Sequence, residues 1–192
     1  MDRHHVLYWG CIAFLLSASL FYGVSVEKQR KAFHSSEGKI ETGSVVRLVR
    51  VIDGDTIQVA QEGQEPATVR ILGIKAFSAK IEKDLESPFG HAAVDTLERI
   101  TKDRAIRVLL NSSPKDRYGR YLATLYVDDQ DVGLRLVRDG LALVYTVFPF
   151  PGMAFYLQEQ ELARAGRRGL WANAEMTAYA SSLMREWQGR QE

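Results

Sequence analysis

Three short apolar runs separated by turn residues constrain the fold of this chain more than any other feature. Residues 45–52 and 56–60 are rich in β-branched and apolar side chains, and the Asp53-Gly54 dipeptide between them is typical of a tight turn. A second turn over residues 62–66 leads to a third run over residues 68–74. Because short strands joined by tight turns pair as neighbours, the sequence predicts a three-stranded antiparallel meander.

The rest of the body adds two strands and three helices. Residues 106–110 and 121–127 have the composition of strands. Helical spacing of apolar residues predicts helices over residues 88–100, 132–137 and 155–168, of which the first begins at a proline and the other two are followed by glycine. Five strands with helices inserted late predict an α+β fold, and we expect an OB-type five-stranded β-barrel.

An uncharged apolar segment, residues 6–26, precedes this body. Its 21 residues, at about 1.5 Å rise each, match a hydrocarbon core of about 30 Å. A cleaved signal peptide is the alternative, but the run is longer than a typical signal core and no clear small-x-small site follows it. We therefore expect a flank over residues 1–5, a single transmembrane helix over residues 6–26 and a linker over residues 27–42. More lysine and arginine follows the helix than precedes it, which favours the cytosolic or matrix side of a membrane for the domain.

Composition excludes several classes of function. The chain has 25 Lys and Arg against 24 Asp and Glu, a net charge of +1, and residues 43–171 have 18 against 17. This balance lacks the basic excess of proteins that coat nucleic acid, so overall charge does not indicate a nucleic-acid partner. The single cysteine, Cys11, excludes an intrachain disulfide, and the four histidines are too scattered to indicate zinc.

Three polar clusters interrupt the apolar pattern of the domain. The Asp53-Gly54-Asp55-Thr56 turn can offer carboxylate oxygens to a hard cation such as calcium, although Asp-Gly is also among the commonest turn dipeptides. Arg70 stands alone in an apolar strand and needs an anion or an outward orientation, because a guanidinium cannot be buried unpaired. Arg120 follows a glycine at the start of a strand, where it can reach over the barrel mouth or remain a solvated loop charge.

In this order and at these intervals, the clusters resemble the staphylococcal-nuclease-like (thermonuclease) family. The similarity covers roughly residues 45–171 and implies an OB-type five-stranded barrel with three helices. The matching stretches are Val51-Ile52-Asp53-Gly54-Asp55-Thr56, Val69-Arg70-Ile71-Leu72-Gly73-Ile74, Phe89-Gly90-His91-Ala92-Ala93, Asp116-Arg117-Tyr118-Gly119-Arg120, Leu136-Val137-Arg138-Asp139-Gly140-Leu141-Ala142 and Arg168-Gly169-Leu170-Trp171.

The resemblance also implies a catalytic site. Family members that cut nucleic acid hold calcium with two aspartates, align water with a glutamate and neutralise the phosphoryl transition state with two arginines. The first aspartate matches Asp55, and the arginines match Arg70 and Arg120. The second aspartate and the glutamate belong to an Asp-x-Pro-Glu segment after the third strand, where this chain reads Lys75-Ala76-Phe77-Ser78. Both of these carboxylates are absent.

This change predicts a degraded catalytic site without a resident cofactor. A lysine ammonium about 4 Å from a divalent cation is repelled by roughly 8 kcal/mol at an effective dielectric constant of 20, so Lys75 disfavours calcium. Ser78 cannot act as a base near neutral pH, and losing a general base costs about a hundred- to ten-thousand-fold in rate. Calcium is expected only if the family mechanism survives, for example through Glu82, Asp84 or Glu86 in the next loop.

Two arrangements of the altered site stay open. In the first, Lys75 replaces the metal by pairing with Asp55, while Arg70 and Arg120 keep an anion site. In the second, each arginine is bonded to a nearby carboxylate.

Aromatic residues and a C-terminal helix complete the candidate features. Tyr145 lies in a segment with several phenylalanines, where the family carries aromatic residues that stack on a base, and a packed loop is the other interpretation. Residues 172–192 have the spacing of an amphipathic helix. That helix can pack on the domain or bind a protein partner, and we favour the partner because the barrel should be complete by Trp171.

Together these features favour a membrane-anchored, catalytically impaired domain over residues 43–171. Its expected role is binding or scaffolding in a membrane-associated assembly, with the lipid bilayer contacted through residues 6–26. The alternative is a metal-dependent nuclease that hydrolyses phosphodiester bonds of DNA or RNA with an altered site. A purely structural role is the third possibility.

Overall fold

The computed structural model describes residues 38–79 and 84–190. The predicted flank, the predicted transmembrane helix and most of the linker lie outside these residues. Within the two described ranges, no helix is both long enough and apolar enough to span a membrane.

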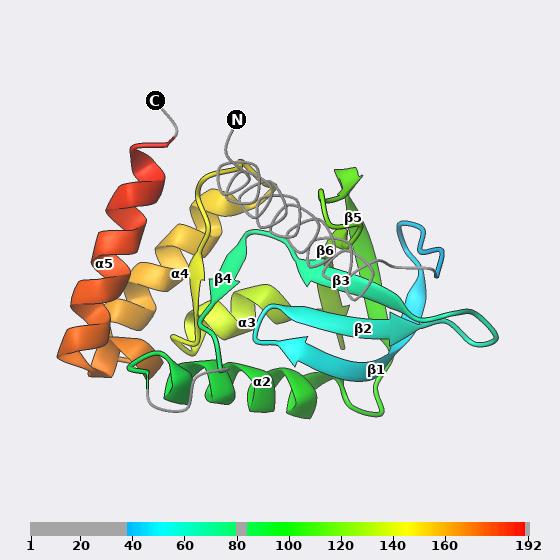
Figure 1. The fold of residues 1–192 in the computed structure, drawn as a ribbon, viewed down its shortest axis with the longest axis horizontal. Coiled ribbons are helices and arrows are strands. Elements are labelled where there is room, and N and C mark those ends of the chain that lie inside the picture. Colours follow the sequence, from blue (N-terminus) through cyan, green and yellow to red (C-terminus); the bar gives the residue numbers. More distant parts are fainter. Residues whose placement is uncertain (1–37, 80–83, 191–192) are drawn as a thin grey trace, which may run out of the picture. The chain divides into compact units, whose positions relative to one another are not determined.

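The described residues form a mixed α+β domain (Figure 1). The strands are β1 (Val45–Asp53), β2 (Thr56–Ala60), β3 (Ala67–Ile71), β4 (Ile74–Ala76), β5 (Ile106–Lys115), β6 (Tyr121–Val127), β7 (Gln130–Asp131) and β8 (Ala142–Val144). The helices are α2 (Ser87–Thr101), α3 (Val132–Arg138), α4 (Met153–Ala165), the 3-10 helix η1 (Gly169–Ala172) and α5 (Ala174–Gln188).

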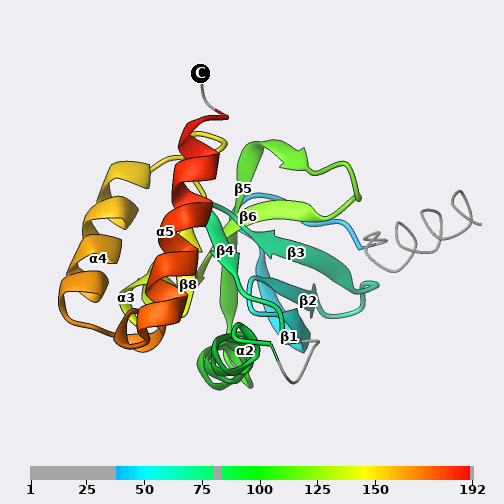
Figure 2. The same ribbon diagram turned by 60° about the vertical axis from the view of Figure 1, so that its left-hand side comes forward.

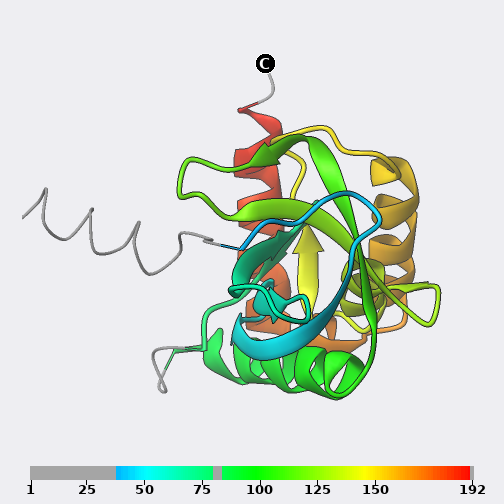
Figure 3. The same cartoon turned by 90° about the vertical axis from the view of Figure 1, so that its right-hand side faces the viewer.

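Five of the strands close into a barrel. They are hydrogen-bonded in the order β3-β2-β1-β5-β6, and a parallel pairing between β3 and β6, with Val69 opposite Tyr121, completes the ring. Figure 3 shows these strands curving strongly around one another. The predicted α+β class and the five predicted barrel strands are confirmed, and the arrangement is consistent with the expected OB-type barrel.

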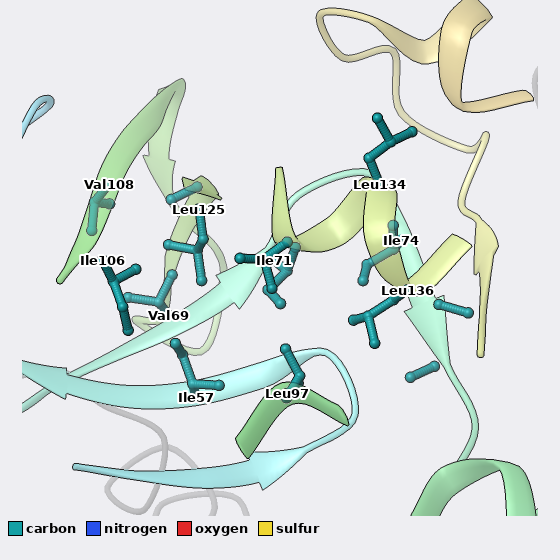
Figure 4. Close-up of a cluster of buried hydrophobic side chains, with 14 of the residues drawn as sticks. Ile57, Val69, Ile71, Ile74, Leu97, Ile106, Val108, Leu125, Leu134 and Leu136 are labelled. Carbon is teal, nitrogen blue, oxygen red and sulfur yellow. The ribbon is translucent and has the colours of Figure 1, made fainter. Parts of the chain in front are cut away.

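The core fills the barrel because the strands alternate between buried and less buried positions. On β6, residues 121, 123, 125 and 127 are buried and the intervening residues are partly exposed. Figure 4 shows side chains of the barrel strands pointing toward one another, beside side chains from β4, α2 and α3 that belong to the same cluster. Full burial of an aliphatic side chain of this kind stabilises the fold by about 1.5–3 kcal/mol. The labelled side chains are Ile57, Val69, Ile71, Ile74, Leu97, Ile106, Val108, Leu125, Leu134 and Leu136.

The third predicted strand is in fact two strands. The sequence pattern predicted one strand over residues 68–74, but β3 ends at Ile71 and β4 begins at Ile74. Between them, Gly73 has a φ of 75°, and a Cβ built on it would lie 2.4 Å from the ring of Phe150. Only glycine fits this backbone and this contact. The break turns β4 away from the barrel to pair with β8, an antiparallel partner that the sequence pattern did not predict.

The C-terminal helix α5 packs on the domain. Figure 2 shows α4 and α5 on the side of the barrel where β4 and β8 lie. The apolar side of α5, which includes Met176, Ala180 and Trp187, belongs to a second buried cluster with Phe77 and Leu143. The predicted amphipathic helix is confirmed, and its apolar stripe is covered within the chain. A protein partner would therefore have to bind the outward side of α5.

Candidate functional site

Asp55 is the last residue of the turn that joins β1 to β2. Its side chain is buried, and both carboxylate oxygens already accept hydrogen bonds from the protein. Oδ1 accepts from the Thr56 hydroxyl at 3.0 Å, and Oδ2 accepts from the Ala76 amide at 2.9 Å. The preceding Gly54 allows this close approach, because a Cβ at that position would lie 2.7 Å from the Ala76 side chain. The turn thus fixes Asp55 against β4.

Arg70 lies on β3 directly opposite Thr56 of β2. Its guanidinium forms an ion pair with the Asp55 carboxylate, and its Nη2 donates to the Ile74 carbonyl at 2.9 Å. Only 14% of the side chain is exposed. Burial, followed by the positive charge of Arg120, lowers the pKa of Arg70 to about 10. Arg70 therefore remains charged at neutral pH, and it lies within electrostatic range of Arg120.

Arg120 ends the loop between β5 and β6. The Asp116 carboxylate accepts from the Arg120 guanidinium at 2.7 Å and from the backbone amides of Tyr118 and Arg120. Gly119 completes the turn with a φ of 82°. The guanidinium lies over the Tyr118 ring, 5.4 Å from its centroid. The role of Asp116 as the partner of Arg120 is not evident from the sequence, where the one signal is that the two residues lie four positions apart in the same motif.

Lys75 lies on β4 between two residues that hold the site together. Ile74 accepts a hydrogen bond from Arg70, and the amide of Ala76 donates to Asp55. Ile74 and Ala76 are buried, whereas the intervening Lys75 is exposed. Desolvation by the surrounding protein, followed by the positive charge of Arg70, lowers the pKa of Lys75. Lys75 forms no ion pair with any residue of the described ranges.

The structure therefore matches the second of the two predicted arrangements. Asp55 pairs with Arg70, and Asp116 pairs with Arg120. The predicted pairing of Lys75 with Asp55 is wrong, because Arg70 occupies the Asp55 carboxylate. The side chain of Lys75 instead lies on the exposed side of β4, opposite to the side on which its neighbours Ile74 and Ala76 are buried.

The segment after Lys75 is fixed by packing. Phe77 is buried in the second cluster, and a Cβ on Gly90 of α2 would lie 2.6 Å from the backbone of Ser78. This close approach holds Ser78 against α2. Of the nearby carboxylates, Asp84 is exposed, and Glu86 raises the pKa of Tyr179 through a hydrogen bond. Glu82 lies outside the described residues.

These residues do not fit the calcium ion that the family uses. Calcium takes about six to eight oxygen ligands. Here the one matched carboxylate, Asp55, already faces Arg70, and the position of the second carboxylate, on β4, is occupied by Lys75. Among residues 38–79 and 84–190, no group of three or more His, Cys, Asp or Glu side chains could hold a metal ion. No step of the chemistry is therefore assigned to calcium.

Tyr145 borders the cationic residues and is positioned from two directions. Its amide donates to the Gly73 carbonyl at 2.9 Å, and its phenol group is within electrostatic range of Arg70. Its ring lies edge-on to Trp187 of α5, with centroids 5.0 Å apart, and 6.2 Å from the ring of Phe148. Phe148 is 69% exposed. The contact with Trp187 was not predicted, since helical spacing alone does not show what a helix packs against.

The fold and the site define a class of protein, a small α+β barrel domain with a cationic site at one end of its strands. A family model described as staphylococcal nuclease homologue matches residues 68–173. This chain belongs to the staphylococcal nuclease family.

Several curated proteins are similar to this chain. An uncharacterized endonuclease of Haemophilus influenzae is 33% identical over 127 residues, which are 66% of this chain and 66% of that protein. An uncharacterized endonuclease of Escherichia coli is 32% identical over 130 residues, 67% of this chain and 78% of that protein. A thermonuclease of Staphylococcus intermedius is 33% identical over 100 residues, 52% of this chain and 59% of that protein. The chain thus spans about three fifths to four fifths of these relatives.

Proposed function

We propose that this domain acts on the phosphodiester backbone of nucleic acid, as an endonuclease of its family with an altered site. The observation that carries the proposal is that Arg70 on β3 and Arg120 just before β6 lie within electrostatic range of each other, because β3 pairs in parallel with β6 and places Arg70 opposite Leu122. Two guanidinium groups within electrostatic range of each other raise the local positive potential, and N–H donors that their partners leave unused can bind an anion such as a phosphate. The names of the similar proteins, which are endonucleases, support the same substrate class.

The two arginines supply binding and charge neutralisation. Each guanidinium has five N–H donors. The carboxylate partners use part of them, and Arg70 also donates to the backbone carbonyls of Asp55 and Ile74, which still leaves donors on both arginines for phosphate oxygens. Donors held in place by Asp55 and Asp116 stabilise developing negative charge without having to reorganise during the reaction. Positions 75 and 78, where the family has carboxylates, hold a lysine and a serine, so no matched carboxylate can activate water. We therefore expect cutting to be about a hundred- to ten-thousand-fold slower than with a general base.

A second candidate function is binding without efficient cutting, as a scaffold in a membrane-associated assembly. The observation that favours it is the exchange of the two family carboxylates for Lys75 and Ser78. Tyr145 and the exposed Phe148 would then stack on bases of a bound single strand without leading to hydrolysis.

The experiment that separates these functions uses the purified full-length chain with single-stranded DNA and RNA, in calcium, magnesium, manganese or chelator. Variants Arg70→Ala and Arg120→Ala are compared with Arg104→Ala, which removes an exposed arginine paired with Asp128. Circular dichroism establishes that each variant is folded. Cutting that both site variants abolish and the control retains supports the nuclease. Binding without cutting supports the second candidate, and absence of both contradicts the proposal.

We also propose that residues 6–26 anchor the domain in a membrane as a single helix. The support is the uncharged length of this segment and the basic residues that follow it. Alkaline carbonate extraction of membranes tests the anchor. The full chain should stay in the pellet, and a chain that begins at Ser36 should be released. Release of both chains would contradict the anchor.

A further inference from the structure

Lys75 is a third positively charged side chain beside the two paired arginines. In the described part of the site, Arg70 and Arg120 each have a carboxylate partner, whereas Lys75 has none. An exposed lysine without an ion pair is common on a protein surface. Lys75 differs because its position is fixed from both sides and because two arginines repel it.

The backbone of β4 fixes where Lys75 begins. The backbone carbonyl of Ile74 accepts a hydrogen bond from Arg70, and the backbone amide of Ala76 donates one to Asp55. Lys75 itself lies opposite Leu143 in the antiparallel pairing of β4 with β8. Its Cβ is therefore held at the edge of the site by three contacts. Only the flexible part of the side chain, which ends in the ammonium group, is free to adjust to a ligand.

The electrostatic surroundings of the ammonium are mixed. Arg70 and Arg120 repel it, and Asp53 and Glu86 attract it without forming an ion pair. A cation held near two others gains most from an anion that contacts all three. A phosphodiester group has two non-bridging oxygens and one negative charge, which suits a set of donors arranged in this way.

We propose that the Lys75 ammonium is a third phosphate-binding cation beside the two arginines, so that Arg70, Lys75 and Arg120 bind a phosphodiester together without any metal ion. The inference rests on the proposed function, since it assumes that a nucleic-acid backbone enters this site. It adds the identity of the third cation and the independence from calcium. Asp55 then acts as a positioning residue, which orients Arg70 through the ion pair and fixes β4 through the Ala76 amide.

The test measures equilibrium binding of a fluorescein-labelled single-stranded oligothymidylate to the full-length chain by fluorescence anisotropy. Binding is measured with excess calcium and with a calcium chelator, and a gel verifies that the probe stays intact. We expect the two dissociation constants to agree within about twofold. Lys75→Met removes the charge and keeps the length of the side chain, and it should weaken binding about tenfold or more, as expected for one charged hydrogen bond.

Two further variants separate charge from shape. Lys75→Arg keeps the positive charge and should restore most of the affinity. Lys102→Met removes an exposed lysine at the end of α2 and should bind as the native chain does. Two results would overturn the inference: stronger binding by tenfold or more on adding calcium, or unchanged binding by Lys75→Met. If the native chain binds the probe in neither condition, the proposed function itself is wrong, which is a different outcome.

Discussion

The Asp55 carboxylate faces a guanidinium, and this contact determines what its removal should do. In a site built around a metal, replacing one clustered carboxylate removes repulsion and often stabilises the metal-free protein. Here Asp55→Asn would leave the largely buried Arg70 without its counter-ion. We expect the free energy of unfolding to fall by about 3 kcal/mol, as for other buried pairs that lose one partner. Urea denaturation followed by circular dichroism measures it.

The control for this prediction is Asp128→Asn. Its carboxylate also pairs with an arginine, Arg104, but both side chains are largely exposed. An exposed pair contributes about 1 kcal/mol or less, so this variant should unfold close to the native midpoint. A stabilising effect of Asp55→Asn would show that Asp55 is kept for a cation other than Arg70.

The sequence predicted which residues lie in the site, but not which carboxylate pairs with which cation. Asp55, Arg70 and Arg120 were indicated by the resemblance of their motifs to those of the family. Whether Arg70 or Lys75 reaches Asp55 depends on where β3 ends, and the apolar pattern runs through that boundary without a break. The positive φ of Gly73 decides the outcome, and a glycine in a strand pattern indicates a bend without giving its direction.

Gly73 is predicted to hold the break between β3 and β4 through its backbone conformation and its contact with Phe150. Gly73→Ala introduces a methyl group where φ is 75° and where the Phe150 ring already lies 2.4 Å from the built Cβ. We expect a loss of about 2–3 kcal/mol in unfolding free energy. Gly63→Ala is a matched control, because Gly63 has nearly the same φ, 74°, but has nothing within 4 Å of a built Cβ. It should lose only about 1 kcal/mol. Equal losses would show that Phe150 does not fix the break.

Helix α5 is predicted to support the aromatic loop beside the site. Trp187 is 6% exposed and packs on Tyr145, so Trp187→Ala should remove about 3 kcal/mol of stability. Gln188→Ala, at the exposed neighbouring position, should be nearly neutral. Chemical denaturation measures both effects. Loss of oligonucleotide affinity by folded Trp187→Ala would show in addition that the helix positions Tyr145, and an unchanged unfolding midpoint would contradict its packing role.

The elements show the same division between what could and could not be predicted. The five barrel strands and helices α2, α3, α4 and α5 follow from local patterns. Strand β8 has three residues, and its pairing with β4 joins segments far apart in the chain, so no local pattern marks it. The packing of α5 was equally hidden, because the apolar surface that receives it is formed by residues from several separate segments, such as Phe77 and Leu143.

For the whole molecule, the near balance of charge limits how nucleic acid can be bound. A net charge of +1 gives little long-range attraction, so affinity must come from contacts within the site. If three cations each neutralise one phosphate of a single strand, the logarithm of the binding constant should fall with the logarithm of salt concentration with a slope of about −2. Lys75→Met should reduce the steepness by about 0.7, and Lys102→Met should leave it unchanged. Anisotropy titrations at several salt concentrations give the slope. A much steeper slope would mean that basic residues outside Arg70, Lys75 and Arg120 carry the binding, and the site would then not be the centre of nucleic-acid recognition.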